Sequence, residues 1–108
     1  MALTPQARET FNRLFGVDPQ PHPTDPELFD ILQNGIFDEA FSTGVLTDVE
    51  RELLTVTVLT AMQTLPQLKA HVGAALNIGA SPLQVRETIY QCELPRSEER
   101  RVGKECRS

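Results

Sequence analysis

Residues 47–92, TDVERELLTVTVLTAMQTLPQLKAHVGAALNIGASPLQVRETIYQC, decide the fold of this chain. The stretch opens with TDVE at 47–50, and a threonine followed three residues later by a glutamate is the signature of a capped helix start. Leucine, valine and alanine then recur at helical spacing on both sides of a proline-containing turn at residues 63–66. Another capping signature, SPLQ at 81–84, follows a glycine that is well placed to end a helix. We therefore predict a helix hairpin over roughly residues 48–79 and a further helix after it.

The residues before this stretch predict two more helices. Thr-Pro at residues 4–5 starts the first, with a hydroxyl cap and a proline in the first turn, and Gly16 ends it. A capping box at residues 24–27 starts the second, which runs towards Gly44 with Asn-Gly at 34–35 as a candidate bend. Phenylalanines gather on these two helices, a pattern typical of core or of a subunit contact rather than of a cofactor site. Because no strand alternation appears, the predicted fold is all-α.

Length, charge and cysteine content narrow the possible functions. A chain of 108 residues makes one small domain, and such helical domains often rely on oligomerisation. The net charge of −5 disfavours nucleic acid and anionic membranes as partners. No apolar run is long enough to span a membrane, and the polar start MALTPQARET is unlike a signal peptide, so we expect a cytoplasmic protein. Cys92 and Cys106 have neither metal nor disulfide spacing.

The last thirteen residues, RSEERRVGKECRS at 96–108, differ from the rest of the chain. They have no apolar periodicity, and they are the translation of a widely used short-read sequencing adapter. A natural basic tail is the alternative interpretation. We predict a single domain over residues 1–95 and an artefactual tail over residues 96–108. The domain would then be cut off near residues 92–95 and would lack a final helix, and apolar surface along Val85, Ile89 and Cys92 would be exposed.

Four short pieces give the chain a resemblance to a known family. They are RELL at 51–54, QLKAH at 67–71, ALNIGAS at 75–81 and IYQC at 89–92. In order and spacing they resemble the carboxymuconolactone decarboxylase family, which includes the alkyl hydroperoxidase D-like proteins. The resemblance implies an orthogonal all-α fold around a helix hairpin, a small-molecule substrate and assembly as a trimer or hexamer. It implies no cofactor and no metal.

The resemblance also assigns candidate catalytic positions. In the hydroperoxidase branch a glutamate, a CxxC cysteine pair and a histidine form a relay, and these positions fall on Glu52, Thr64, Gln67 and His71. A hydroxyl and an amide cannot be oxidised and reset by disulfide exchange, so a CxxC peroxidase mechanism is unsupported at Thr64 and Gln67. The decarboxylase branch resembles this chain better, because it too can lack CxxC.

Decarboxylation of a γ-lactone acid needs a group that holds carboxylate charge and an acid that protonates the resulting dienolate. We assign His71 as the proton donor, Arg51 as the substrate-binding cation and Glu52 as the group that orients His71. Each has an alternative: Glu52 as an exposed acid in a first helical turn, His71 as a packed histidine bonded to a backbone carbonyl, and Arg51 as a surface ion-pair partner. Axial rise alone offsets Glu52 and His71 by about 7–8 Å in the hairpin, which leaves a direct bond between them open.

Three functions therefore stand at this stage. The first is a cofactor-free lyase of the decarboxylase type, with a substrate from aromatic catabolism. The second is a peroxide-reducing enzyme, in which Cys92 would be the natural thiol. The third is a non-catalytic helical oligomer or binding protein. The position of His71 discriminates between them, because the lyase needs this side chain at a mostly apolar pocket with Arg51 or Glu52 nearby.

Overall fold

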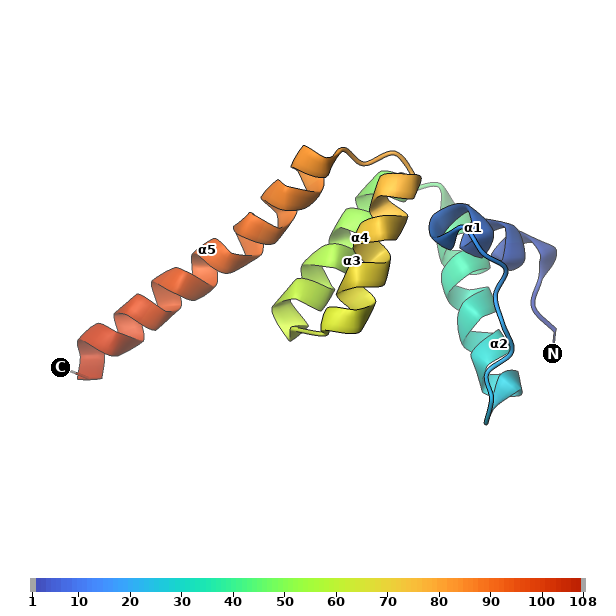
Figure 1. Cartoon of the computed structure of the whole chain (residues 1–108), viewed down its shortest axis with the longest axis horizontal. Coiled ribbons are helices and arrows are strands. Elements are labelled where there is room, and N and C mark those ends of the chain that lie inside the picture. Colours follow the sequence, from blue (N-terminus) through green and yellow to red (C-terminus); the bar gives the residue numbers. More distant parts are fainter. Residues whose placement is uncertain (1, 108) are drawn as a thin grey trace.

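The computed structural model describes the backbone of residues 2–107 and the side chains of residues 2–95. Every regular element in that part of the chain is helical, which confirms the all-α prediction. Figure 1 shows the hairpin in the middle, the N-terminal helices on one side and the last helix on the other. The elements are α1 (Pro5–Phe15), α2 (Pro26–Asn34), the π-helical η1 (Gly35–Ala40), the 3₁₀-helical η2 (Phe41–Thr43), α3 (Asp48–Met62), α4 (Leu65–Asn77) and α5 (Pro82–Arg107).

The predicted hairpin is confirmed as the antiparallel pair α3 and α4. The Thr47 hydroxyl accepts a hydrogen bond from the Glu50 backbone N–H, and the Glu50 carboxylate accepts one from the Thr47 N–H, which completes the capping box. The same backbone hydrogen bond from Thr47 lowers the pKa of Glu50. At the other end of α3, Gln63 takes the left-handed conformation with φ 58°, and Pro66 follows in the first turn of α4. This short turn reverses the chain direction, so α4 runs antiparallel to α3.

Helix α1 packs against α4 and carries half of the first core cluster. The Thr4 hydroxyl caps it by accepting from the Ala7 N–H, and Gly16 ends it with φ 74°. Leu14 is fully buried in a cluster with Ala7, Phe37 and Ala74. The Asn77 side chain on α4 donates to the Leu14 carbonyl at 2.7 Å, which fixes the C-terminal end of α1 against the hairpin.

The second predicted helix is one helical run with an irregularity at the expected place. The α-helical ladder of α2 ends at Asn34, and the chain continues as η1 from Gly35. Asn34 is buried because its side chain secures the N-terminal segment: Oδ1 accepts from the Thr4 N–H at 2.8 Å and Nδ2 donates to the Ala2 carbonyl at 3.0 Å. Gly44, with φ 71°, ends the run.

Helix α5 covers the other face of the hairpin, and this corrects one prediction. Val85 is only 5% exposed, in a second core cluster with Ala75 and Ala80, and Ile89 packs against that cluster. Cys92 is half-buried. The expectation of exposed apolar surface along Val85, Ile89 and Cys92 is therefore wrong, because the first turns of α5 dock into the groove between α3 and α4. The exposed large apolar side chains of the last three helices are instead Leu54, Val58, Met62, Leu65, Leu76, Leu83, Tyr90 and Leu94.

Beyond this docked part, the backbone of α5 runs on through Pro95 to Arg107 and leads away from the rest of the molecule (Figure 1). The side chains of residues 96–108 lie outside the described residues, so the adapter origin of this segment stays a prediction. Among the described residues, none of the helices has the length and apolar character that crossing a membrane requires.

Candidate functional site

Glu52 and His71, two of the candidate catalytic residues, bond each other directly. Glu52 lies on the face of α3 that also carries Val56 and Thr60, and its side chain is 2% exposed. His71 on α4 faces it, with Nδ1 2.8 Å from Glu52 Oε2. The long glutamate side chain reaches across the axial offset between the two positions. The two residues therefore form a direct bond, which the helix rise alone had left undecided.

Both alternatives for this pair are wrong. Glu52 is not an exposed acid, because its side chain is almost completely buried. His71 bonds a carboxylate rather than a backbone carbonyl. With the Glu52 carboxylate as the acceptor of this bond, its hydrogen lies on Nδ1. Glu52 therefore fixes the ring so that Nε2 is the nitrogen left for other work, and no hydrogen bond to Nε2 occurs within the described part of the chain.

The pair lines a cavity of about 740 Å³ between α1, the α2–η2 run and the hairpin. Five phenylalanines and His71 make up half of its lining residues, and His71 stands edge-on to Phe15 with ring centroids 5.3 Å apart. Phe37 stands edge-on to Phe11 at 5.4 Å and to Phe15 at 5.9 Å, so the rings brace one another. The lining residues are Phe11, Phe15, Phe29, Gln33, Ile36, Phe37, Phe41, Glu52, Thr55, Gln67, Ala70 and His71.

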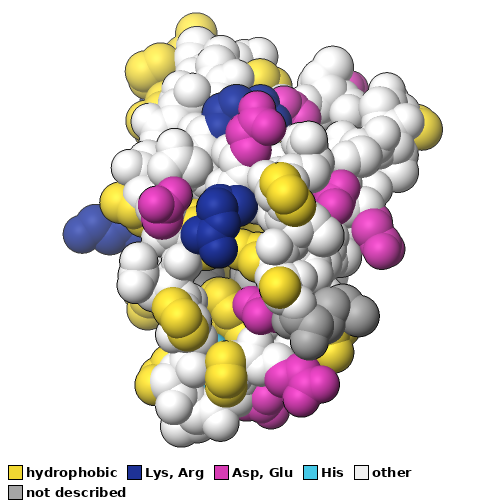
Figure 2. Space-filling model, turned by 90° about the vertical axis from the view of Figure 1, so that its right-hand side faces the viewer, with side chains coloured by type: hydrophobic (Ala, Val, Ile, Leu, Met, Phe, Trp, Pro, Cys, Tyr) yellow, Lys and Arg dark blue, Asp and Glu magenta, His cyan; other side chains and the backbone are white. Residues whose placement is uncertain are grey.

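The phenylalanines contribute to the core, as predicted, and also line a cavity. Phe37 is buried in the first core cluster, and Phe11, Phe15 and Phe41 pack against that cluster. All five phenylalanines line the cavity that holds the Glu52–His71 pair, which the sequence pattern did not predict. The outward side of α2 carries exposed aliphatic residues, namely Leu28, Ile31 and Leu32. Figure 2 looks onto this end of the molecule and shows hydrophobic side chains around a recess, between charged ones.

Three uncharged polar side chains complete the wall, and two of them were not foreseen. Gln67, at one of the two cysteine positions of the redox relay, lines the cavity, as does Thr55. Thr64, at the other position, is the N-cap of α4, makes no side-chain cap bond and lies outside the lining. Gln33 on α2 has a buried Oε1 atom with no hydrogen-bond partner. The structure therefore places Gln67, but not Thr64, beside His71.

Arg51 lies next to the cavity but is not part of its lining. Its Nη2 donates to the Thr43 hydroxyl at 2.6 Å, and its guanidinium carbon sits 5.7 Å from the centroid of Phe41, a cation–π contact. Its Nε is buried without a partner. Arg51 forms no ion pair among the described side chains, so the surface ion-pair alternative is wrong. The Phe41 ring joins it to the cavity wall.

Cys92 belongs to a different place. Its thiol lies 3.8 Å from the Thr57 carbonyl oxygen, and both residues line a separate hollow of about 540 Å³ against α5. Neither Glu52 nor His71 borders that hollow. The structure thus separates the thiol from the acid and imidazole.

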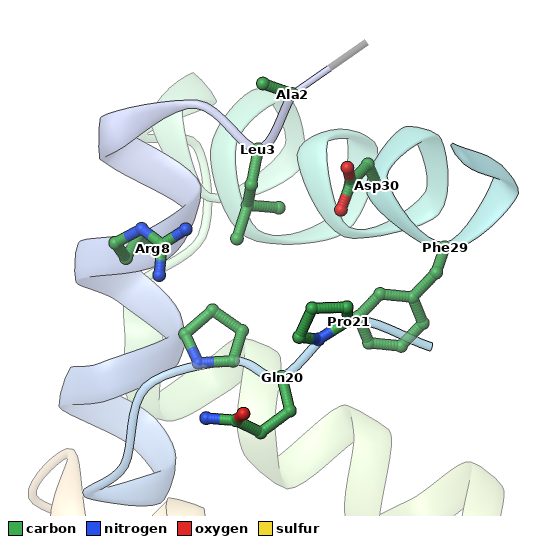
Figure 3. A pocket seen from close by; sticks show the side chains of 8 residues that line it. Ala2, Leu3, Arg8, Gln20, Pro21, Phe29 and Asp30 are labelled. Carbon is green, nitrogen blue, oxygen red and sulfur yellow. The ribbon is translucent and has the colours of Figure 1, made fainter. Parts of the chain in front are cut away.

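A smaller cavity of about 310 Å³ opens between the N-terminal segment, the linker and α2. Figure 3 shows Arg8 on α1 and Asp30 on α2 at its sides, with Leu3 pointing into it and Pro21 beside Phe29. Phe29 borders both this cavity and the one with His71. It therefore forms the partition between the two spaces.

The larger cavity contains one side chain suited to proton transfer, His71, which is held by the buried Glu52 carboxylate in a mostly apolar space. Among the described residues, the ionisable side chains of the lining are Glu52 and His71. Such a site suits general acid–base work on a ligand that is itself largely apolar. The five phenylalanines and Gln33 line this candidate site, and sequence reasoning did not assign them to it.

Comparisons with known proteins agree with this architecture. A sequence model of the carboxymuconolactone decarboxylase family matches residues 26–100, from the first residue of α2 into α5. Helix α1, which supplies Phe11 and Phe15 to the cavity, lies before the match. Searches of curated proteins and of solved structures gave no significant match. Since the matched segment covers well over half of its length, this chain belongs to the carboxymuconolactone decarboxylase family.

Proposed function

We propose that the protein is a cofactor-free decarboxylase that acts on a γ-lactone acid or a related intermediate of aromatic catabolism, with His71 as proton donor. The observation that carries the proposal is the 2.8 Å bond between His71 Nδ1 and the buried Glu52 carboxylate at the wall of an aromatic cavity. A buried acid that fixes a histidine tautomer is the arrangement of a positioned general acid. Membership of the family supports the same reaction class.

In the proposed reaction the bond between the ring carbon and its carboxylate breaks, and carbon dioxide leaves. The electron pair of that bond passes into the unsaturated lactone and forms a dienolate. The imidazolium Nε2–H of His71 then protonates the dienolate carbon, and the double bond shifts. Glu52 stabilises the imidazolium before this step, and neutral His71 regains its proton from solvent afterwards.

The phenylalanine wall supports the bond-breaking step. A carboxylate is poorly solvated among apolar rings, whereas carbon dioxide is neutral and loses little there. Phe11, Phe15 and Phe37 supply such an environment directly beside His71. As carbon dioxide leaves, the negative charge moves from the carboxylate onto the dienolate, where it is delocalised. The apolar space therefore disfavours the localised charge of the reactant more than the spread charge of the transition state.

The peroxide-reducing alternative has less support. Thr64 and Gln67 stand at the relay's cysteine positions, and the Cys92 thiol borders another hollow. A single thiolate can attack a peroxide, but reset of the oxidised thiol through an internal disulfide requires a second thiol within reach. We therefore place this function behind decarboxylation. A non-catalytic binding role uses the same cavity and is distinguished from the lyase by turnover alone.

The test is release of carbon dioxide by the wild-type protein from carboxymuconolactone and from lactone acids that carry a single carboxylate. We expect turnover of at least one of them without added metal or cofactor, followed by gas-phase mass spectrometry and by the ultraviolet change of the lactone. Specific binding of these acids with no release of carbon dioxide would contradict the lyase and favour the binding protein. Peroxide consumption without carbon dioxide release would favour the second function.

Arg51 is proposed to attract the substrate carboxylate to the cavity entrance. Its position over Phe41, outside the lining, suits capture rather than a bond in the reacting complex. We expect Arg51→Gln to raise KM several-fold and to leave kcat unchanged. Arg86→Gln, at an exposed arginine paired with Glu87, is the matched control and should change neither constant. A fall in kcat for Arg51→Gln would instead place the guanidinium in the reacting complex.

We also propose a homo-oligomer, a trimer or hexamer, as the family resemblance implies. The support is the exposed apolar side chains of the last three helices, which include Leu54 and Val58 on α3 and Tyr90 on α5, each more than half exposed. Sedimentation velocity that finds only a monomer would contradict this.

A further inference from the structure

Besides His71, the cavity wall carries three polar side chains that could donate a hydrogen bond to a ligand, namely Gln33, Thr55 and Gln67. The Thr55 hydroxyl donates to the Arg51 carbonyl at 2.9 Å, so its proton is already committed. Gln33 comes from α2, a different wall of the cavity from α4, which carries His71. Gln67 is on α4, it is exposed, and its amide makes no hydrogen bond within the described part of the chain. The Gln67 amide is therefore a donor that is free to meet a ligand beside His71.

Gln67 lies one helical turn before His71. Residues four apart on a helix share a face, with Cβ atoms about 5–6 Å apart, and both of these side chains line the same cavity. Glu52 holds Nδ1 of His71, which leaves Nε2 for the ligand. A ring that meets Nε2 with one of its atoms is therefore within reach of the Gln67 amide with a neighbouring atom.

The dienolate of the proposed reaction needs a donor close to the imidazole. Its negative charge collects on the lactone carbonyl oxygen, and the carbonyl carbon is bonded directly to the carbon that His71 protonates. Arg51 carries a positive charge at the cavity entrance, but it is outside the lining and bonds Thr43. The Glu52 charge is already paired with the imidazole. A neutral amide leaves this charge balance unchanged, and preorganised N–H donors stabilise a developing oxyanion.

We propose that Gln67 is a further catalytic residue, whose amide N–H donates a hydrogen bond to the lactone carbonyl oxygen as negative charge collects there. No bond is made or broken at Gln67, and the hydrogen bond is strongest while the oxygen is charged. This role rests on the proposed function, because the dienolate belongs to that reaction. One face of α4 then carries two tasks: His71 moves the proton, and Gln67 holds the charge.

Gln67→Met tests the role by kinetics, because it keeps the length of the side chain and removes the donor. We expect it to lower kcat for carbon dioxide release by about 100- to 1,000-fold, the usual cost of losing one oxyanion donor, and to leave KM within about twofold. Gln67 is exposed and belongs to neither core cluster, so the fold should persist, which circular dichroism checks. Gln91→Met, at an exposed glutamine of α5 outside this cavity, is the matched control and should change neither constant.

A binding measurement separates this role from the reaction. Tetronate is a five-membered lactone whose enolate charge is shared with the ring carbonyl oxygen, so it mimics the dienolate and has no carbon dioxide to lose. γ-Butyrolactone has a ring of the same size and no charge. Gln67→Met should weaken the binding of tetronate roughly tenfold or more, since hydrogen bonds to charged groups are the stronger ones, and should weaken the binding of γ-butyrolactone much less. NMR titration of the wild-type protein and the variant gives both dissociation constants.

The contrary outcomes are distinct from failure of the lyase. Equal binding of tetronate by the wild-type protein and Gln67→Met, no binding of tetronate at all, or an unchanged kcat would overturn the role of Gln67. A larger loss of tetronate affinity with Gln33→Met than with Gln67→Met would move the donor to α2 and overturn it as well. Weakened tetronate binding by Gln67→Met, with no carbon dioxide released by the wild-type protein, would overturn the reaction and leave Gln67 as an oxyanion-binding group.

Discussion

Replacing His71 with glutamine is expected to lower kcat for carbon dioxide release by about 100- to 10,000-fold, the usual contribution of a positioned general acid. Glutamine keeps a polar side chain that can still bond Glu52, but it cannot carry and release a proton. The fold should persist, because His71 is still partly exposed at 22% and its role in the core is small. The measurement is kcat from initial rates, with circular dichroism to confirm that the helices remain.

The chain offers a matched control for this substitution. His22 is the other histidine, it is exposed, and its Nδ1 accepts from the backbone N–H groups of Thr24 and Asp25 in the linker. His22→Gln should leave kcat unchanged. Glu52→Gln should cause a smaller loss than His71→Gln, since it removes the charge that supports the imidazolium but not the imidazole itself. If His71→Gln and His22→Gln retain the same kcat, His71 is not the proton donor.

Replacing Leu14 with alanine is expected to lower the free energy of unfolding by about 2–5 kcal/mol. Leu14 is fully buried where α1 meets α4 and is among the largest completely buried side chains. Its loss leaves a void between Ala7, Phe37 and Ala74, at the point where α1 is held to the hairpin. Urea unfolding followed by circular dichroism gives the change. Because α1 carries Phe11 and Phe15, ligand binding in the aromatic cavity should weaken as well.

Leu32→Ala is the control for this stability effect. Leu32 is 53% exposed on α2, so the same atoms are removed from a site that water already reaches, and the expected change is within about 0.5 kcal/mol. A similar loss for Leu32→Ala would show that the cost comes from helix propensity or association rather than from the core. A negligible loss for Leu14→Ala would contradict the docking of α1 described above.

The hairpin and the ends of most helices followed from local sequence because capping signals are local. The threonine at 47 and the glutamate at 50 satisfy each other's backbone groups wherever the rest of the chain lies. Family resemblance then placed Glu52 and His71 on facing helices. The burial of Glu52 could also have been predicted from the sequence. Glu52, Val56 and Thr60 are spaced four residues apart, which places all three on the inner face of α3.

The cavity was not predictable from the sequence, since its walls come from three separate parts of the chain. Periodicity shows that Phe11 and Phe15 share a face of α1, but the pattern is the same whether that face fills a core or borders a space. Likewise, the prediction that Val85 is exposed to solvent was wrong, because the docking of α5 depends on the groove between α3 and α4. Gln33 carries no sequence signal at all, and only its unpaired buried oxygen marks it.

The central claim is that His71, held by Glu52, delivers the proton to the dienolate carbon, and isotope labelling tests it most directly. Turnover of an accepted lactone acid in deuterium oxide should place one deuterium at that carbon in a single configuration, seen by proton NMR, because the imidazole exchanges with solvent and reaches one face of the ligand. His71→Gln should lose this selectivity in whatever residual product it forms. Product with deuterium in both configurations from the wild-type protein, or unchanged selectivity in His71→Gln, would contradict the account.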